Sequence, residues 1–242
     1  MAEFFTPENM IALLTLTSLE IVLGIDNIVF IAILTSRLPP EQRPKIRRIG
    51  LGLAMIQRIL LLFAISWIVR LTDPLFAVLG RDISGRDLIL IGGGLFLIAK
   101  ATFEIHGTLE GGHDKPGTNA KSTSVTSILM QIALLDTVFS LDSVITAVGM
   151  VSNVNVMIAA VIISVAVMMI FANPISEFIT KHPTLKMLAL SFLLLIGVVL
   201  VADGSGKHIE KGYIYFAMGF SLLVEMLNLK LRGSRTAGTK TH

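Results

Sequence analysis

The chain has 242 residues, of which 53% are hydrophobic and 15% charged, and it contains no cysteine. Soluble domains carry about 25% charged residues, so this composition, with a mean hydropathy of +0.79, excludes an ordinary soluble domain and indicates a chain that crosses a membrane several times. The lack of cysteine excludes a disulfide framework and a thiolate metal site. The net charge of +3 does not indicate nucleic-acid binding, because the basic residues lie at the ends of apolar segments, where they report topology.

Apolar segments follow one another along the whole chain. The N-terminal residues are acidic, and no small-residue cleavage site follows the first apolar segment, so we expect that segment to remain in the mature protein. A membrane-spanning helix needs about 20 apolar residues. Seven segments approach that length, at residues 10–34, 49–71, 88–103, 125–150, 154–171, 185–202 and 212–229. The sequence therefore predicts an all-α membrane protein with seven transmembrane helices.

The connections indicate how the segments are organised. Residues 107–123 are rich in Gly, Lys, Asn, Pro, Ser and Thr, which predicts a flexible linker between two halves, and residues 233–242 predict a disordered tail. Basic residues concentrate in the first loop, which places that loop in the cytoplasm, the N-terminus outside and the C-terminus, after seven spans, inside. These basic residues are Arg37, Arg43, Lys45, Arg47 and Arg48.

Two of the segments contain nearly the same acidic phrase. The first runs from Glu20 to Asn27 as E-x-x-x-G-x-D-N, and the second from Asp136 to Ser143 as D-x-x-x-S-x-D-S. Because these segments are three spans apart, they cross the membrane in opposite directions. This predicts a 3+3 inverted repeat, an architecture of secondary transporters, within a single membrane domain at 1–232. Repeat one would cover about 10–103, repeat two about 125–202, and 212–229 would be an extra C-terminal helix. Similarity between the third spans is faint, at 95–98 and 193–196.

The phrases place four carboxylates within predicted spans. A carboxylate at the bilayer centre costs roughly 2.5 to 3.5 kcal/mol, and packing alone does not require four of them, so we expect a cation to offset their charge. Since the two helices run in opposite directions, Glu20 should lie at the depth of Asp142, and Asp26 at the depth of Asp136.

The spacing within each phrase raises a geometric problem. Residues six apart in an ideal helix point roughly 120° away from each other, so the two acids of one phrase do not share a face. Either the cavity is broad, or the helices loosen at Gly24 and Ser140. We favour loosening, because glycine permits it and broken helices coordinate cations in transporters.

The oxygen-rich side chains of the phrases indicate the kind of ion. Hard oxygen donors suit manganese, magnesium and calcium, whereas sulfur and imidazole suit zinc and copper, and the five histidines lie in loops, near span ends or in the tail. The candidate metal ligands are Glu20, Asp26, Asn27, Asp136, Ser140, Asp142 and Ser143.

Intramembrane acids can instead be structural ion-pair partners. Arg58 is a candidate partner, either purely structural or as a built-in cation that occupies the site when no metal is bound. Lys100 and Glu104, four residues apart, predict a local ion pair. Interfacial aromatic residues are predicted at Trp67, Tyr213 and Tyr215.

The two phrases resemble the signature of the TerC family of integral membrane proteins, and the resemblance extends from about residue 10 to residue 229. It implies a multi-pass protein of the bacterial inner membrane, related to the LysE transporter superfamily. It also implies relatives linked to manganese efflux and to the metal loading of exported enzymes.

Our leading hypothesis is a transporter that exports a divalent metal cation, Mn²⁺, as its substrate by alternating access. An enzyme is not expected, because the sequence contains no recognisable catalytic motif. One alternative is a non-transporting membrane partner that loads metal into exported enzymes. Another is an exporter of an amino acid or other organic solute, whose site should show an aromatic or apolar pocket beside the acids. The expected partners are the lipid bilayer and the metal cation, with a homo-oligomer, exported metalloenzymes and secretion machinery as further candidates, and no nucleic acid.

Overall fold

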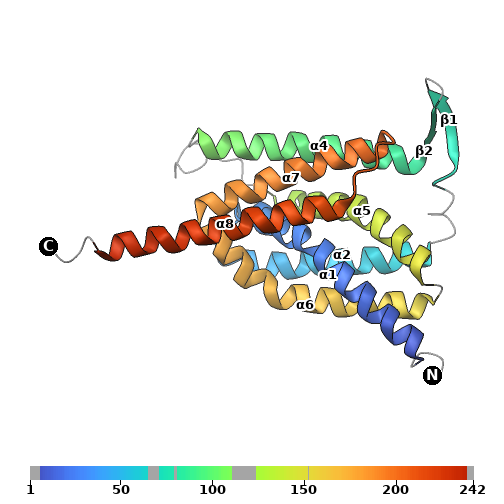
Figure 1. Cartoon of the computed structure of the whole chain (residues 1–242), viewed down its shortest axis with the longest axis horizontal. Helices are drawn as coiled ribbons and strands as arrows, with labels where there is room; N and C mark the ends of the chain where they lie inside the picture. The colour runs from blue at the N-terminus through green and yellow to red at the C-terminus, as the bar shows by residue number, and fades with distance from the viewer. Residues whose placement is uncertain (1–5, 65–70, 79–80, 111–123, 152, 239–242) are drawn as a thin grey trace.

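Long helices dominate the structure, a computed structural model that describes residues 6–64, 71–78, 81–110, 124–151 and 153–238. The side chain of Asp142 is outside this description, although its backbone is within a helix. The described helices lie side by side, successive ones run in opposite directions, and the two termini lie at opposite ends of the bundle (Figure 1). Their bounds are α1 Pro7–Thr35, α2 Arg43–Phe63, α4 Gly85–Leu109, α5 Val125–Met150, α6 Val154–Lys181, α7 Pro183–Gly204 and α8 Lys211–Gly238.

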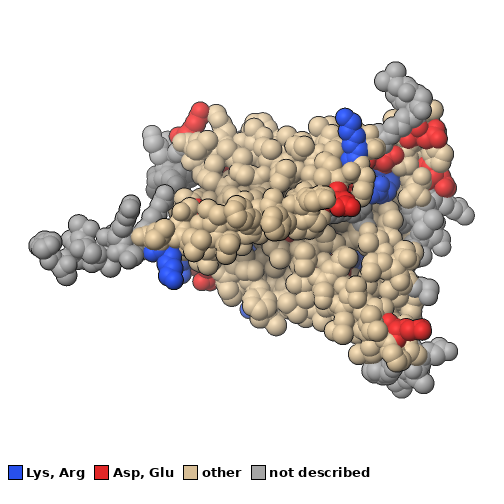
Figure 2. All heavy atoms as spheres, viewed as in Figure 1, with Lys and Arg blue, Asp and Glu red and all other residues tan. Residues whose placement is uncertain are grey.

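Six of these helices are long and apolar enough to span a membrane: α1, α4, α5, α6, α7 and the part of α8 at Gly212–Leu231. On the face shown in Figure 2, the charged residues gather toward the ends of the bundle and leave a largely uncharged band between them. Such a band suits the hydrocarbon layer of a bilayer. The prediction of an all-α membrane fold is confirmed.

Among the described helices, α2 is too polar to meet the same criterion. Arg47, Arg48 and Arg58 interrupt its apolar residues, and Arg58 is buried. The helix packs against α5 and α6, so its polar side chains find partners inside the protein rather than in lipid. The predicted second span at 49–71 therefore corresponds to a helix with a polar interior face, and residues 65–70 of that span lie outside the described residues.

A short hairpin follows α2 and was not predicted from the sequence. Strands β1 (Pro74–Val78) and β2 (Arg81–Ser84) pair in antiparallel register, with Phe76 opposite Ile83. The hairpin lies at the same end of the bundle as the N-terminus (Figure 1). Its last residue, Ser84, begins α4 with a reciprocal capping box, in which the Asp87 carboxylate accepts from the Ser84 backbone and the Ser84 hydroxyl accepts from the Asp87 backbone.

Several helices extend beyond the predicted spans. Helix α6 continues through Pro174 to Lys181 instead of ending at Phe171. On α2, the Arg47 guanidinium donates to the Asn173 side-chain oxygen at 3.1 Å, which ties this extension to the bundle. Helix α8 continues to Gly238, so the tail predicted to be disordered is helical up to that residue. The linker predicted at 107–123 begins as helix, because α4 extends to Leu109. Linker residues 111–123 lie outside the described residues.

The helices pair in a pattern that supports the predicted repeat. Helix α1 packs chiefly against α6, α5 against α2, and α4 against α7. The triple α1, α2 and α4 can be exchanged with the triple α5, α6 and α7, in that order. The exchange turns the α1–α6 pair into the α5–α2 pair and leaves the α4–α7 pair unchanged. Helix α8 stands outside this exchange and packs on α7.

The α4–α7 crossing shows the same exchange at atomic detail. A Cβ added at Gly94 would lie 2.6 Å from the Gly197 carbonyl oxygen, and one added at Gly197 would lie 2.9 Å from the Gly94 carbonyl oxygen. Only residues without a side chain allow two backbones to approach so closely. The crossing matches 94–98 with 197–201, so the faint similarity of 95–98 to 193–196 is not the structural equivalence.

Candidate functional site

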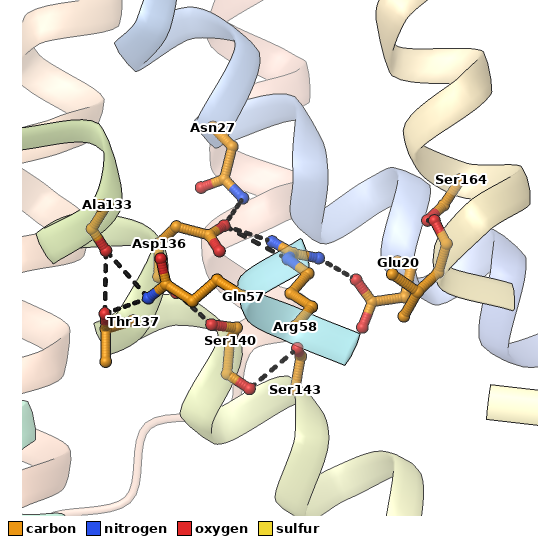
Figure 3. A network of polar contacts seen from close by, with 11 residues as sticks. Glu20, Asn27, Gln57, Arg58, Ala133, Asp136, Thr137, Ser140, Ser143 and Ser164 are labelled. Atoms are coloured by element: carbon orange, nitrogen blue, oxygen red, sulfur yellow. Dashed lines mark hydrogen bonds and ion pairs between the residues drawn. The ribbon is translucent and has the colours of Figure 1, made fainter. Parts of the chain in front are cut away.

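A buried arginine bridges the two acidic phrases at the centre of the bundle (Figure 3). Arg58 of α2 forms an ion pair with Glu20 of α1 through Nη1. It also pairs with Asp136 of α5, whose Oδ1 lies 3.0 Å from Nη2 and 3.3 Å from Nε. All three side chains are buried. One guanidinium therefore faces two carboxylates, and the group carries one excess negative charge when both acids are ionised.

Asp136 is bonded unevenly. Its Oδ1 accepts from Arg58 and, at 3.4 Å, from the Asn27 side-chain amide of α1. Its Oδ2 is buried and has no hydrogen-bond partner within the described residues. A buried carboxylate oxygen without a donor is costly, so this atom is the part of the cluster most ready to accept a further cation or proton.

The hydroxyls of the second phrase donate to backbone carbonyls of their own helix. Ser140 donates to the Asp136 carbonyl, and Ser143 donates to the Ser140 carbonyl at 3.3 Å. A hydroxyl that donates its hydrogen to a carbonyl keeps its oxygen lone pairs free. Both serines therefore retain the ability to act as oxygen ligands, and Ser143 lines a cavity.

That cavity has a volume of about 50 Å³ and lies beside Asp26. Asp26 is buried, with 6% of its surface exposed, and none of the described side chains makes a hydrogen bond or ion pair with its carboxylate. Removing a carboxylate from water without a partner is strongly unfavourable, so a bound cation or a proton on Asp26 would be favourable. Five helices contribute to the lining, with Leu23, Asp26, Arg58, Phe139, Ser143, Ile196, Val199, Leu200, Ile214 and Tyr215.

The contact between Asn27 and Asp136 agrees with the predicted similar depth of Asp26 and Asp136, and the predicted pair of Glu20 and Asp142 involves a side chain outside the description. The partners of the acids were not predicted. Glu20 and Asp136 meet at the same arginine, and Asn27, rather than Asp26, reaches Asp136. Successive residues of a helix point about 100° apart. Asn27 therefore faces α5, whereas Asp26 faces α7 and α8.

The predicted ligands whose side chains are described lie in two neighbouring groups. Within the described side chains, which exclude that of Asp142, no group of three or more Asp, Glu or His residues is placed to hold a metal ion. The structure brings Asp26 and Ser143 to one cavity and places Glu20, Asn27 and Asp136 in the arginine cluster. Their role as metal ligands stays a prediction.

The predicted loosening of the two helices is wrong. Both α1 and α5 are continuous through Gly24 and Ser140. At Gly24 the missing side chain serves packing instead, because an added Cβ would collide with the Met168 sulfur of α6. At Ser140 the hydroxyl bonds within its own helix.

Tyr215 is a residue of the site that the sequence analysis placed elsewhere. It was assigned to the interfacial aromatic residues, but it lines the cavity together with Asp26. It comes from α8, which lies outside the repeat, so the repeat gave no signal for it. By contrast, the predicted pair of Lys100 and Glu104 is confirmed at 3.6 Å, and Arg37 joins it.

The fold and the buried charges define a multi-pass integral membrane protein of transporter type. The model of the integral membrane protein TerC family matches residues 5–240, and the chain belongs to that family.

Relatives support the assignment. The chain is 56% identical to a UPF0053 protein of Haemophilus influenzae over 93% of this chain and 95% of that protein. It is 52% identical to the UPF0053 inner membrane protein YgdQ of Escherichia coli over 92% of this chain and 93% of YgdQ. It is 54% identical to the UPF0053 inner membrane protein YoaE of Escherichia coli, of which it spans only 43%. No solved structure matches the chain.

Proposed function

We propose that the protein is an inner-membrane transporter that exports a divalent metal cation, Mn²⁺, through the cavity beside Asp26. One observation carries the proposal: the buried Asp26 carboxylate, which has no hydrogen-bond or ion-pair partner among the described side chains, faces a cavity at which α1, α2, α5, α7 and α8 meet. In a membrane-spanning bundle, an ionisable residue of this kind marks an ion or substrate pathway. Family membership supports a transporter type of protein.

The chemistry and size of the cavity support a small hard ion. Asp26, Ser143 and Tyr215 offer carboxylate, hydroxyl and phenol oxygens, which suit manganese, magnesium and calcium better than softer metals. A volume of about 50 Å³ accommodates an ion with one or two waters, since a water occupies about 30 Å³ of liquid. Pockets for organic ligands are roughly 300 to 1,000 Å³.

Ion flux into liposomes tests the proposal directly. Purified protein in vesicles should move manganese faster than protein-free vesicles do, and zinc should be a poor substrate relative to manganese. Magnesium and calcium in parallel vesicles define the order within the hard ions. If no divalent ion moves, transport is excluded, and the metal-loading partner for exported enzymes becomes the better hypothesis.

The orientation of the chain is part of the same proposal, with the N-terminus outside and the C-terminus in the cytoplasm. The chain contains no cysteine, so a single introduced cysteine is its only thiol. Glu8→Cys and Lys230→Cys lie at exposed positions of α1 and α8. In intact cells with a permeable outer membrane, a membrane-impermeant reagent should label the first and not the second, and labelling of both from one side would exclude the odd number of passes that the seven-span prediction requires.

Export of an organic cation is a second candidate, favoured by one observation. A larger and almost wholly apolar groove of about 540 Å³ lies between α1, α6, α7 and α8, and Asp26 and Tyr215 line it as well. An apolar pocket beside an acid is what the organic-solute alternative predicted. In the liposome assay, an apolar ammonium compound that is itself transported and that blocks manganese would favour this candidate.

A further inference from the structure

Arg58 lies between the acid cluster and the cavity beside Asp26. Its guanidinium pairs with Glu20 and Asp136, and its side chain also lines the cavity that Asp26 faces. Figure 3 shows it extending from α2 between the helices that carry the two phrases. A cation held by Asp26 therefore has a fixed positive charge as its neighbour, at the boundary between the cavity and the other two acids.

The bonding of the cluster leaves an opening for a second cation. The described donors to Asp136 converge on Oδ1, and its buried Oδ2 has no partner within the described residues. One guanidinium does not neutralise two carboxylates. A divalent ion would neutralise both, but the repulsion between two cations prevents Arg58 from remaining in place beside it.

We propose that Arg58 is a tethered cation that competes with the transported ion for Glu20 and Asp136. While the ion is held at Asp26, Arg58 occupies the two acids. When the ion passes to Glu20 and Asp136, Arg58 turns across the cavity wall to Asp26. This inference rests on the proposed function. It assigns to Arg58 the control of when Glu20 and Asp136 are available to the ion.

The exchange follows from the energetics of buried charge. An arginine left buried without a partner is strongly destabilising, so Arg58 can leave the two acids only if another carboxylate receives it. Asp26 is the described carboxylate that lines the same cavity. In each arrangement every buried carboxylate of the three is close to a positive charge, which keeps the transfer of the ion feasible in a dry interior.

The test compares manganese binding by purified wild-type protein and Arg58→Gln, measured as the shift in melting temperature on titration with manganese chloride. The tethered cation predicts that Arg58→Gln melts below the wild type without divalent ions. It also predicts a larger shift, with half-saturation at a manganese concentration at least about tenfold lower, because the competitor is gone. Arg58→Lys keeps the charge and should keep the weaker wild-type response.

Two further variants control the experiment. Arg86→Gln removes a positive charge from α4, where Arg86 pairs with Asp203 at 3.4 Å, and should leave the manganese response unchanged. If Arg58→Gln does not fold, Glu20→Gln combined with Arg58→Gln restores the charge of the cluster. That double variant should still bind manganese more tightly than the wild type, because Asp136 is then free.

The outcomes separate this inference from the proposed function. Manganese shifts that are equal in the wild type, Arg58→Gln and the double variant with Glu20→Gln, or absent from all three, overturn the tethered cation and leave Arg58 as a structural partner. If liposomes with wild-type protein transport manganese in that case, the proposed function stands without it. If Arg58→Gln binds manganese more tightly but the wild type shows no flux, the competition is real and the transport proposal fails.

Discussion

The two acidic phrases are nearly interchangeable in sequence, yet equivalent positions can find different partners: Asn27 donates to Asp136 of the other phrase, whereas Ser143 donates to its own helix. The leading acids of the phrases, Glu20 on α1 and Asp136 on α5, meet at Arg58. The second acid of the first phrase, Asp26, turns instead to a cavity bordered by the extra helix α8. A repeated motif therefore fixes where its side chains lie along a helix, and the neighbouring helices decide which partners those side chains find.

The neighbouring helices differ in one decisive position. In the first triple, α2 supplies the positively charged Arg58, whereas α6, which takes its place in the second triple, brings the uncharged Ser164 to the vicinity of Glu20 (Figure 3). Ser164 is fully buried and donates to the Val161 carbonyl of its own helix at 2.9 Å. The buried Arg58 thus makes the two triples differ in charge beside the acids of the phrases.

The largest effect should come from neutralising Asp26, the buried acid for which the described side chains provide no partner. We expect Asp26→Asn to lower manganese flux into liposomes by more than about 100-fold. A charge interaction with a divalent ion is worth several kcal/mol, and each 1.4 kcal/mol is tenfold. The melting temperature should stay the same or rise, because a buried amide is less costly than an unpaired carboxylate. Glu225→Gln, a partly exposed acid on α8, is the control, and unaltered flux in Asp26→Asn would remove Asp26 from the pathway.

Asp142→Asn in the same assay tests the predicted ligand whose side chain the structure does not describe.

The arginine-bound acid should behave in the opposite way. Asp136→Asn should lower the free energy of unfolding by about 3 kcal/mol, the low end for breaking a buried ion pair, since Glu20 still holds Arg58. The measurement is thermal or denaturant unfolding in detergent, beside Asp26→Asn. Equal stability of the two variants would mean that the difference between the phrases is not electrostatic.

The glycine crossing tests whether the two halves meet as equivalents. Gly94→Ala and Gly197→Ala each place a Cβ within 3 Å of the opposite backbone, which cannot give way as a side chain does. We expect each to lower the free energy of unfolding by about 1 to 3 kcal/mol. Gly92→Ala adds the same atom to the same helix with nothing within 4 Å and should be close to neutral. Unequal losses of stability at Gly94 and Gly197 would argue against a structural equivalence of the two halves.

The smallest effect concerns the contribution of α8. Tyr215→Phe removes only the hydroxyl beside the cavity, and we expect about a fivefold rise in the manganese concentration for half-maximal flux, the equivalent of about 1 kcal/mol. Tyr213→Phe, at an exposed position two residues away, is the matched control. A change of the same size in both variants would assign the effect to α8 packing instead of to the cavity.

Most of the fold could be predicted because long apolar segments have few alternatives in a membrane. The helices and the opposite directions of α1 and α5 follow from segment length and order (Figure 1). The hairpin β1–β2 could not be predicted, because its strands are only five and four residues long and give no clear alternation of apolar and polar positions. The continuation of α6 past Pro174 was missed for a different reason: a proline usually ends a helix, and the Arg47–Asn173 contact that accompanies the continuation is long-range.

The site was predicted in its residues but not in its arrangement. The phrases identified Asp26 and Asp136 as buried acids, and composition made Arg58 a candidate partner. Which side chains of α1 reach Arg58 and Asp136 depends on the rotation of that helix, which turns Glu20 and Asn27 toward the cluster and Asp26 toward the cavity. The helix loosening predicted at Gly24 was wrong because glycine serves both helix breaks and close packing. Only the position of Met168 distinguishes the two uses.

The hairpin has a consequence for the lipid around the protein. Among the described residues, its two strands pair only with each other, so the outer edge of each strand presents backbone groups that no neighbouring strand satisfies. Leu75 and Phe76 are exposed on it and suit the interfacial region of a bilayer. Open sheet edges do not occur within hydrocarbon, so the hairpin should rest at the membrane surface. It should therefore limit how deeply this end of the bundle enters a thicker bilayer.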